Sequence, residues 1–302
     1  MQHKGDSPAL GAFAGQRFEN ILGPASARYF GEGFRRVSHA IEIVSVNDAH
    51  EAIAMQGVGS ARYPEDWSFD ASGRPRPVHL SSFDAIALTS AVLRAATAFN
   101  DKVRALLVGS VRRVQVKAPA QTISDTAHIN VTVQCIDPLA AGTVRVSSRV
   151  EGFVVDIVAE RTRHGGRPID LQLHDRGQRE ALSTGKVLHA TTGDLHAVHE
   201  LGIPPAALTC VEELAIFGQL SQIAVYAAKQ LDRRSVPNLW LRRLTLDRSV
   251  DPRLRTFESR TTLTRDRVLL IGGEEVVDLT LMAEASYGAR AEASFGFRVP
   301  PR

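Results

Sequence analysis

Residues 80–99 read LSSFDAIALTSAVLRAATAF, and residues 208–227 read LTCVEELAIFGQLSQIAVYA. In each stretch a hydroxyl residue is followed three places later by a carboxylate: Ser81-x-x-Asp84 and Thr209-x-x-Glu212. A hydroxyl and an acid at this spacing satisfy the free backbone N–H groups where a helix begins. Few charged residues follow in either stretch, which is typical of a helix buried on nearly all sides. The sequence therefore predicts two matched, buried helices.

The similarity between these two stretches continues beyond the helices. The segment Ser110–Val116 reads SVRRVQV, and the segment Trp240–Leu246, 130 residues later, reads WLRRLTL. Both alternate in the manner of a strand. A helix followed by an arginine-rich strand, found twice, indicates a tandem duplication. We expect one pocket, and any chemistry, where the two halves meet.

The order of the predicted elements favours an α+β fold. Three or four predicted strands follow each helix without another helix between them, whereas a parallel α/β sheet needs a helix between most strands. One long buried helix wrapped by an antiparallel sheet is the hotdog architecture. We therefore predict a tandem (double) hotdog, with an N-terminal lead-in at residues 1–32, a first hotdog at 33–165 and a second at 166–302.

Alternating apolar residues and turn residues define the remaining elements. A strand or a helix is open for residues 50–62, and residues 21–34 read as a glycine-punctuated lead-in without regular structure. The predicted helices are 83–99 and 211–231, and the predicted strands are 39–46, 105–117, 127–136, 143–161, 187–201, 238–247, 255–265, 268–283 and 289–299. The sequence predicts a frayed tail at 1–15, a loop at 64–78, a linker at 162–185 and a turn at Gly272-Gly273.

Composition excludes several classes of protein. Of the 302 residues, 44% are hydrophobic and 23% are charged, and the net charge is only +3, which fits a soluble globular protein. Scattered arginines and few aromatics argue against nucleic-acid binding. No apolar run is long enough for a membrane span, and no secretory signal is evident. Two cysteines suggest neither a disulfide framework nor a zinc site, so we expect a cytoplasmic protein.

Several short motifs occur in a fixed order through the first third of the chain. They are Ile21-Leu-Gly-Pro, Tyr29-Phe-Gly-x-Gly-Phe34, Tyr63-Pro-x-x-Trp67-Ser and His79-Leu-Ser-Ser-x-Asp84. Together they resemble the avirulence D (AvrD) family, which is linked to bacterial production of syringolide-like acyl-sugar lactones. The duplicated hotdog also has a parallel in the A-factor-type butenolide synthases and the polyketide dehydratases, by fold analogy.

The resemblance implies a biosynthetic enzyme of secondary metabolism, an acyltransferase that condenses a β-ketoacyl thioester with a small sugar or polyol. Its partners would be an acyl carrier protein or acyl-CoA and the sugar acceptor, and a homodimer is compatible with the sequence. No cofactor is implied beyond the phosphopantetheine or coenzyme A that carries the thioester. The alternatives are a double-hotdog dehydratase, isomerase or thioesterase, and a non-catalytic module that binds acyl ligands.

His79 is the main catalytic candidate. In hotdog enzymes the start of the buried helix faces the thioester carbonyl, where its dipole and N–H groups suit an oxyanion. An imidazole near a helix N-terminus is disfavoured in its charged form, which leaves a neutral base. A loop histidine bonded to backbone is the alternative. Ala207 stands at the matching place in the second half, so the sequence predicts one active site per chain.

The acids and amides of the helices are the other candidates. Asp84 and Glu212 are either helix caps or catalytic groups, and Glu213 corresponds to Ala85, so no cap role explains it. Gln219 and Gln222 share a side of the second helix with Glu212. We predict catalytic roles for His79, Glu213, Asp84 and Gln219, and substrate contacts for Tyr63, Trp67, Glu212 and Gln222.

Two further patterns point away from other chemistry. Polyketide dehydratases have a glycine four residues after their histidine, where this chain has Phe83. Simple dehydration is therefore disfavoured, although a pair formed by His79 and Glu213 across the halves stays open. His196 and His199 would point to opposite faces of a strand, so no metal site is predicted. Tyr63 and Trp67 would line either the pocket mouth or the core.

Overall fold

The computed structural model describes residues 13–49, 52–69, 74–106, 109–136, 142–161, 182–203, 208–229, 231, 239–248 and 254–298. The first half contains β1 (Ser38–Ala49), β2 (Ala52–Arg62), α2 (Ser82–Thr97), α3 (Asp101–Leu106), β3 (Gly109–Lys117), β4 (Ile129–Ile136), β5 (Thr143–Val150) and β6 (Phe153–Arg161). The second half contains β7 (Ser183–Ala190), β8 (Asp194–Leu201), α4 (Cys210–Lys229), β9 (Trp240–Asp247), β10 (Thr256–Ile271), β11 (Glu274–Ala285) and β12 (Arg290–Arg298).

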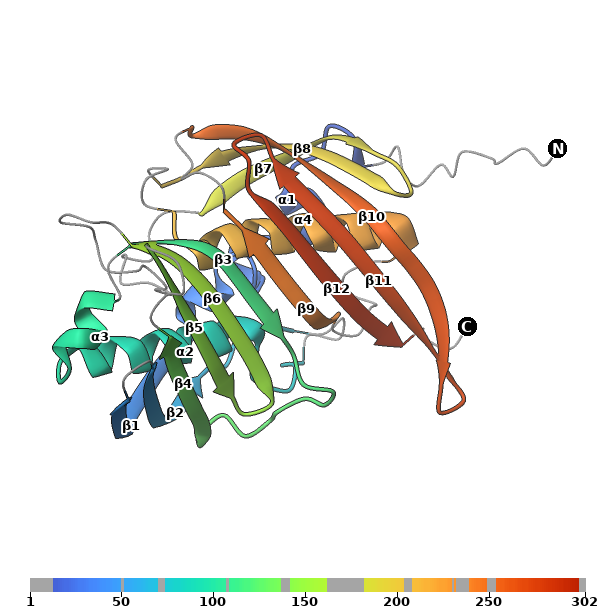
Figure 1. Ribbon diagram of the computed structural model, residues 1–302. Coiled ribbons are helices and arrows are strands. Elements are labelled where there is room, and N and C mark those ends of the chain that lie inside the picture. The colour runs from blue at the N-terminus through green and yellow to red at the C-terminus, as the bar shows by residue number, and fades with distance from the viewer. Residues whose placement is uncertain are drawn as a thin grey trace.

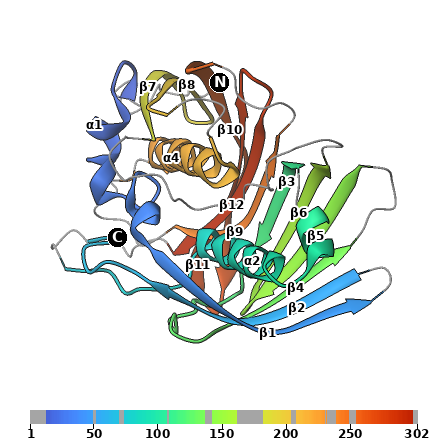
Figure 2. The ribbon, with the colours of Figure 1, turned by 90° about the vertical axis from the view of Figure 1, so that its left-hand side faces the viewer.

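These strands form one 12-stranded sheet, in the order β1-β2-β4-β5-β6-β3-β9-β12-β11-β10-β8-β7 (Figure 1). The two halves have the same strand order when each is read inward from its own edge of the sheet. The first half reads β1-β2-β4-β5-β6-β3, and the second reads β7-β8-β10-β11-β12-β9. In each half the helix comes between the second and third strands of the chain and lies on the inner side of the curved sheet (Figure 2). The fold is a double hotdog of the α+β class, as predicted.

The two halves join through an antiparallel pairing of β3 with β9. Gln115 lies opposite Thr245, its own counterpart 130 residues later, and the neighbouring pairs Val114 with Leu246 and Val116 with Leu244 are arranged symmetrically about it. A local two-fold axis therefore passes through this pair. The duplication seen in the sequence is a symmetric one, with the seam in the middle of the sheet.

Both long helices form the core of their halves. In α2 the side chains of Phe83, Ile86 and Leu88 are at most 2% exposed, and α4 is buried over most of its length. Burying a large apolar side chain stabilises the fold by about 1.5–3 kcal/mol, so these helices are held by packing. Gly59 of β2 permits the close approach, because a Cβ there would come within 2.7 Å of Leu88 Cδ2.

The N-terminal lead-in packs on both halves: residues 18–22 lie against the second half, and Tyr29 and Phe30 lie against the start of α2. It contains α1 (Phe18–Leu22) and a 3₁₀ turn at Ala25–Ala27, and a second 3₁₀ turn at Gly33–Arg36 follows it, whereas we expected no regular structure at residues 21–34. Phe18 lies over β7, where a Cβ on Gly185 would come within 2.5 Å of its ring. Glycines separate these turns, so each is too short to show a helical period in the sequence.

Other predicted boundaries also changed. The single strands expected at 143–161 and 187–201 are the hairpins β5–β6 and β7–β8, because two strands with the same alternation read as one when the turn between them is short. Glu151 forms one such turn with a left-handed φ of 49°. Residues 50–62 contain a strand, and α3 precedes β3. Residues 1–12 of the expected tail and most of the expected linker, like the boundary at 165/166, lie outside the described residues, whereas the Gly15 N–H donates to the backbone oxygen of Val187 at 2.8 Å.

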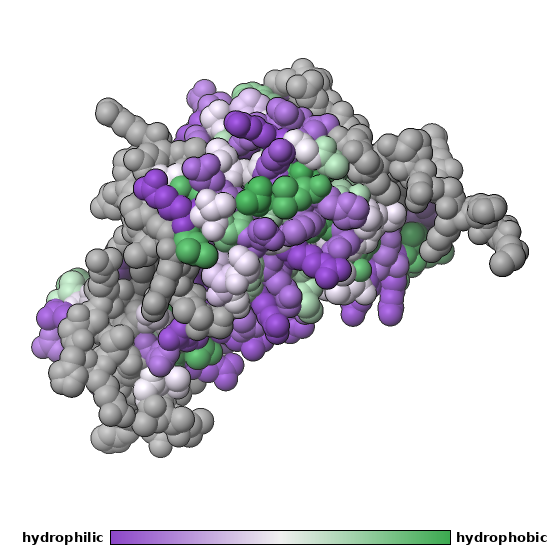
Figure 3. Space-filling model, turned by 90° about the horizontal axis from the view of Figure 1, so that it is seen from above, coloured by the Kyte–Doolittle hydropathy of each residue, from purple (hydrophilic) through white to green (hydrophobic). Residues whose placement is uncertain are grey.

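On the face shown in Figure 3, most of the coloured side chains are hydrophilic, and the apolar ones form small patches. Among the described residues, none of the helices combines the length and apolar character needed to cross a membrane.

Candidate functional site

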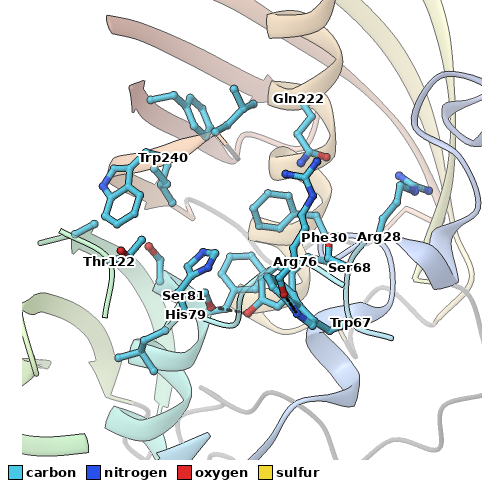
Figure 4. Close-up of a pocket in the computed structure, with 18 of the residues that line it drawn as sticks. Arg28, Phe30, Trp67, Ser68, Arg76, His79, Ser81, Thr122, Gln222 and Trp240 are labelled. Atoms are coloured by element: carbon cyan, nitrogen blue, oxygen red, sulfur yellow. Dashed lines mark hydrogen bonds between the residues drawn. The ribbon is translucent and has the colours of Figure 1, made fainter. Parts of the chain in front are cut away.

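A cavity of about 430 Å³ lies where the two halves meet (Figure 4). The first half contributes His79 and the first residues of α2 to its wall. The second half contributes Gln222 from α4 and Trp240, the first residue of β9. A pocket at the junction of the halves is what the repeat predicts, and His79 lines it.

His79 is held between two indole rings. Its imidazole stacks on Trp240 of the other half, with ring centroids 6.4 Å apart and planes inclined by 18°, and it meets Trp67 edge-on at 5.7 Å. Its Nδ1 lies 3.3 Å from the carbonyl oxygen of Pro77. A carbonyl only accepts, so Nδ1 is the donor, and the neutral ring keeps its lone pair on Nε2. This tautomer suits a general base.

The start of α2 presents hydrogen-bond donors beside the same cavity. Ser81 caps the helix: its Oγ accepts from the backbone N–H of Asp84 at 3.2 Å, and its own N–H donates to the Asp84 carboxylate at 2.7 Å. The next two residues, Ser82 and Phe83, line the cavity. First-turn N–H groups have no acceptor within the helix and carry its positive dipole end. They suit a developing oxyanion.

Asp84 holds the start of α2 in place through buried hydrogen bonds. Its side chain accepts from His39 Nε2 at 2.8 Å and from the hydroxyl of Tyr63, as well as from Ser81. Burial alone would raise the pKa of Asp84, but the hydrogen bonds and charge around it, His39 first, outweigh burial and lower it. Asp84 is fully buried and does not line the cavity. The structure therefore shows it as a helix cap and an anchor.

Two tyrosines tie this anchor to the cavity wall. The hydroxyl of Tyr63 lies 2.9 Å from the backbone oxygen of His79, and the hydroxyl of Tyr29 lies 2.5 Å from Ser81 Oγ. Burial first and then the charge of Asp84 raise the pKa of both tyrosines, which stay protonated. Tyr29 lines the cavity, whereas Tyr63 contacts His79 from behind it. The network fixes His79 and Ser81 in place.

The start of α4 repeats the cap but not the cavity. The Thr209 N–H donates to the Glu212 carboxylate at 2.8 Å, and the Glu212 N–H donates to Thr209 Oγ1 at 3.2 Å. Arg35, from the 3₁₀ turn at Gly33–Arg36, reaches the same carboxylate at 3.0 Å. Glu212 is 1% exposed and does not line the cavity, contrary to the predicted substrate contact. Its carboxylate is satisfied by the cap and by Arg35.

Glu213 also lies away from the cavity, so the expected meeting of His79 and Glu213 does not occur there. The hydroxyl of Tyr287 donates to Glu213 at 2.5 Å, and Arg248 Nε lies 2.6 Å from the other carboxylate oxygen. All three side chains belong to the second half. An acid on a buried helix needs such partners, and here they come from the protein.

The remaining candidates divide between the cavity and the core. Trp67 and Gln222 line the cavity, and a contact of either with substrate stays a prediction. Gln219 does not, because its side-chain oxygen accepts from Arg28 Nη1 at 2.7 Å. Although Gln219 and Gln222 are only three residues apart on α4, Gln219 is bound to Arg28 and Gln222 lines the cavity.

The described residues hold no group of three or more side chains suited to a metal ion. His199 is buried against Phe257 and lies 2.7 Å from Ser259 Oγ, while His196 on the other face of β8 lies 3.1 Å from Glu258. Burial lowers the pKa of His199 to about 3. The two histidines therefore serve different structural roles on opposite faces.

Several residues of the cavity escaped the sequence reasoning: Arg28, Tyr29, Arg76 and Trp240. Tyr29 belongs to a motif shared with the AvrD family, which was a usable signal. Trp240 begins the repeated strand, at the place where the first half has Ser110. The arginines gave no pattern, because the lead-in and the loop that carry them have no regular period.

Three solved structures illustrate what the chain is similar to. A protein described as a thioesterase from Novosphingobium aromaticivorans is 13% identical, with a TM-score of 0.41, covering 85% of this chain and 98% of its own. One described as an oleoyl thioesterase from Lactobacillus plantarum is 11% identical, with a TM-score of 0.43, covering 84% and 99%. The dehydratase domain of the CurJ module of curacin polyketide synthase is 12% identical, with a TM-score of 0.37, covering 86% and 97%.

These scores are too low to support an argument, and the fold assignment rests on the strand order and helix positions of this chain. Among curated proteins the comparison found no match. Residues 15–164 match the family described as Pseudomonas avirulence D protein (AvrD). That range includes the motifs from Ile21 to Asp84, the whole first hotdog and the first wall of the cavity. Through residues 15–164, the chain belongs to the AvrD family.

Proposed function

We propose that this chain condenses a β-ketoacyl thioester with a hydroxyl group of a small sugar or polyol, as membership of the AvrD family suggests. The observation that carries the proposal is the position of His79, which lines a cavity next to the donors at the start of α2. A base and an oxyanion site beside one another are the two elements that acyl transfer requires.

In the proposed step, Nε2 of His79 removes the proton from the acceptor hydroxyl. The hydroxyl oxygen attacks the thioester carbonyl carbon, and the N–H groups at the start of α2 stabilise the negative charge on the carbonyl oxygen. The carbon–sulfur bond then breaks, and the His79 proton passes to the leaving thiolate. The products are an acyl ester of the sugar and a free thiol. Later ring closure would give the lactone.

The lining of the cavity suits an acyl chain. Its apolar residues come from both halves and include Phe83, Phe153, Leu239, Leu241 and Phe295. A carrier protein or coenzyme A would deliver the chain as a thioester, so the enzyme itself needs no further cofactor.

Hydrolysis is the competing reaction at the same site, because water can replace the sugar hydroxyl as the nucleophile. Dehydration is less well supported, since it calls for an acid facing His79, and Glu213 is bound to Tyr287 and Arg248 instead. A non-catalytic acyl-binding role would leave His79 without a task.

The experiment measures thiol release from a β-ketoacyl-CoA, with and without candidate sugars, and identifies the products by mass spectrometry. We expect a sugar adduct, and we expect His79→Ala to lower its rate by about 10²–10⁴-fold. His128→Ala is the control, because His128 is exposed and does not line the cavity.

Full product formation by His79→Ala, with the histidine control unchanged, would overturn the assignment of the base. Free β-keto acid as the sole product would replace condensation by hydrolysis. Binding of the acyl thioester without any thiol release would favour the non-catalytic role.

A further inference from the structure

The acids and amides of α4 differ in whether the protein supplies their partners. The helix carries four of them: Glu212, Glu213, Gln219 and Gln222. The first three bind other side chains, as described above. Within the described part of the chain, no group is hydrogen-bonded to the side-chain amide of Gln222. Polar groups inside proteins are almost always paired, so this amide points to a partner on the ligand.

Gln222 is also the one of these four residues that lines the cavity. In Figure 4 its side chain extends from α4 into the cavity, from the side opposite His79 and Ser81. The unpaired amide of the second half therefore faces the reactive groups of the first half.

The two halves contribute different chemistry to the wall around this amide. Among the described lining residues, the hydroxyl-bearing aliphatic ones all belong to the first half: Ser68, Ser81, Ser82 and Thr122. Besides Gln222, the second half contributes aromatic and aliphatic side chains: Tyr226, Leu239, Trp240, Leu241 and Phe295. A sugar acceptor suits the wall with the hydroxyls, and an acyl chain suits the apolar wall in which Gln222 stands.

Ser82 indicates where the thioester carbonyl lies. It is the first residue of α2, it is only 7% exposed, and it lines the cavity. Its hydroxyl also has no hydrogen-bond partner among the residues that the structure describes, so it adds a side-chain donor to the free N–H groups at the helix start. A thioester whose carbonyl is held there directs its acyl chain toward the apolar wall that contains Gln222.

We propose that Gln222 recognises the β-keto group of the acyl thioester, with the side-chain NH₂ donating to the keto oxygen. The keto carbon follows the thioester carbonyl after a single methylene, so its oxygen is the next polar atom along the chain. A saturated chain has no acceptor there and would leave the amide unpaired, which a site built around a hydrogen bond penalises. The proposal rests on the proposed function for the acyl thioester, and it adds the residue that selects the keto form.

The experiment compares two thioesters of equal length that differ only in the keto group, β-ketooctanoyl-CoA and octanoyl-CoA. Thiol release gives kcat/KM for each, and it counts condensation and hydrolysis alike. The variants are Gln222→Met and Gln222→Leu, both of which favour a helix. Gln134→Met is the control, because Gln134 is exposed on β4 and does not line the cavity. Thermal unfolding checks that each variant is folded.

We expect the kcat/KM ratio of the keto to the saturated thioester to fall by about 5–100-fold in both Gln222 variants, because a hydrogen bond inside the cavity is lost. The value for octanoyl-CoA should not fall, since that chain never makes the contact. Gln134→Met should keep the wild-type ratio. Should the protein bind these thioesters without releasing thiol, their affinities from calorimetry should show the same change in ratio.

An unchanged ratio in the folded Gln222 variants, or an equal loss for both thioesters, would overturn the proposal. A higher KM for the sugar acceptor at an unchanged ratio would assign Gln222 to the acceptor and overturn it as well. A lower ratio without any sugar adduct would keep the role of Gln222 and replace condensation by hydrolysis. A sugar adduct with an unchanged ratio would keep the proposed function and remove the role of Gln222.

Discussion

The two buried helices begin with the same cap but in different surroundings. Ser81 with Asp84 at the start of α2 corresponds to Thr209 with Glu212 at the start of α4, and the backbone hydrogen bonds match in both length and direction. The first start opens onto the cavity. The second is surrounded by charged partners, with Arg35 on Glu212 and Arg248 on the adjacent acid.

The comparison shows that both copies keep the cap at the start of the helix, whereas the surroundings of the two helix starts differ. Capping is a local requirement, and each half meets it with its own pair of residues. Glu213 stands where α2 has Ala85. This second buried carboxylate is tolerated at the start of α4 because Tyr287 and Arg248 bind it. Only the start of α2 lines the cavity.

The largest effect should come from removing a buried carboxylate at the start of α4. Glu213→Ala leaves the guanidinium of Arg248, which is 8% exposed, without its partner in the core. Removing one member of a buried ion pair costs about 3–5 kcal/mol. We expect chemical denaturation to show a loss of this size, while the folded variant keeps its kcat. A large fall in kcat at unchanged stability would instead place Glu213 in the chemistry.

The second effect concerns how the free energy of unfolding depends on pH through His199, in the second half. Because the pKa of His199 is lowered to about 3 by burial, while an unfolded histidine titrates near ~6.5, only the unfolded chain gains its proton between these values. The contribution of buried, neutral His199 to the free energy of unfolding is therefore complete above pH ~6.5 and is lost as the pH falls.

The expected loss is about 1.4 kcal/mol per pH unit within that window. Denaturation at pH 6.5 and pH 4.5, above the range in which Asp84 titrates, should show it. His199→Phe should flatten the dependence, and His128→Phe, at an exposed site, should not. Equal slopes in all three proteins would contradict the buried neutral state of His199.

A smaller effect should separate positioning from chemistry at the open start. Tyr63→Phe removes the hydroxyl that contacts the backbone oxygen of His79 and the carboxylate of Asp84. The base stays present but less well fixed, so we expect kcat to fall about tenfold, which corresponds to about 1.4 kcal/mol, with little change in KM. A change in KM alone would mean that Tyr63 contacts substrate.

The smallest effect compares the caps themselves. Ser81→Ala and Thr209→Ala each remove a capping oxygen and should each cost about 1 kcal/mol of stability. Only Ser81 lines the cavity and contacts Tyr29, so only Ser81→Ala should also change the kinetics of condensation. Kinetic changes of equal size in both variants would erase the distinction between the two starts.

Much of the fold was accessible from the sequence because it depends on local patterns. The offset between the halves, the caps and the alternation of the strands are all visible along the chain, and together they predicted two helices and an antiparallel wrapping. The hairpins β5–β6 and β7–β8 were missed, because a tight turn such as that at Glu151 barely interrupts the alternation. The pairing of β3 with β9 was likewise beyond reach, since no local signal records a partner strand.

The site was predictable only in part. His79 and Gln222 were singled out from their relation to the helices, and Trp67 as an aromatic residue of an AvrD-like motif, and all three line the cavity. Glu213 and Gln219 were predicted to act in the cavity but lie outside it, because their partners come from segments distant in sequence. Glu213 is bound by Tyr287, in the turn before β12, and Gln219 by Arg28, in the lead-in. Helical periodicity gives the side of a helix but not what stands opposite it.

The seam has one further consequence. β3 and β9 each have neighbours on both sides, so each half would end in an unpaired edge strand if the two halves were separated. Exposed backbone of that kind recruits other strands and promotes aggregation. A fragment cut between the repeats would carry a bare strand as well as an incomplete pocket.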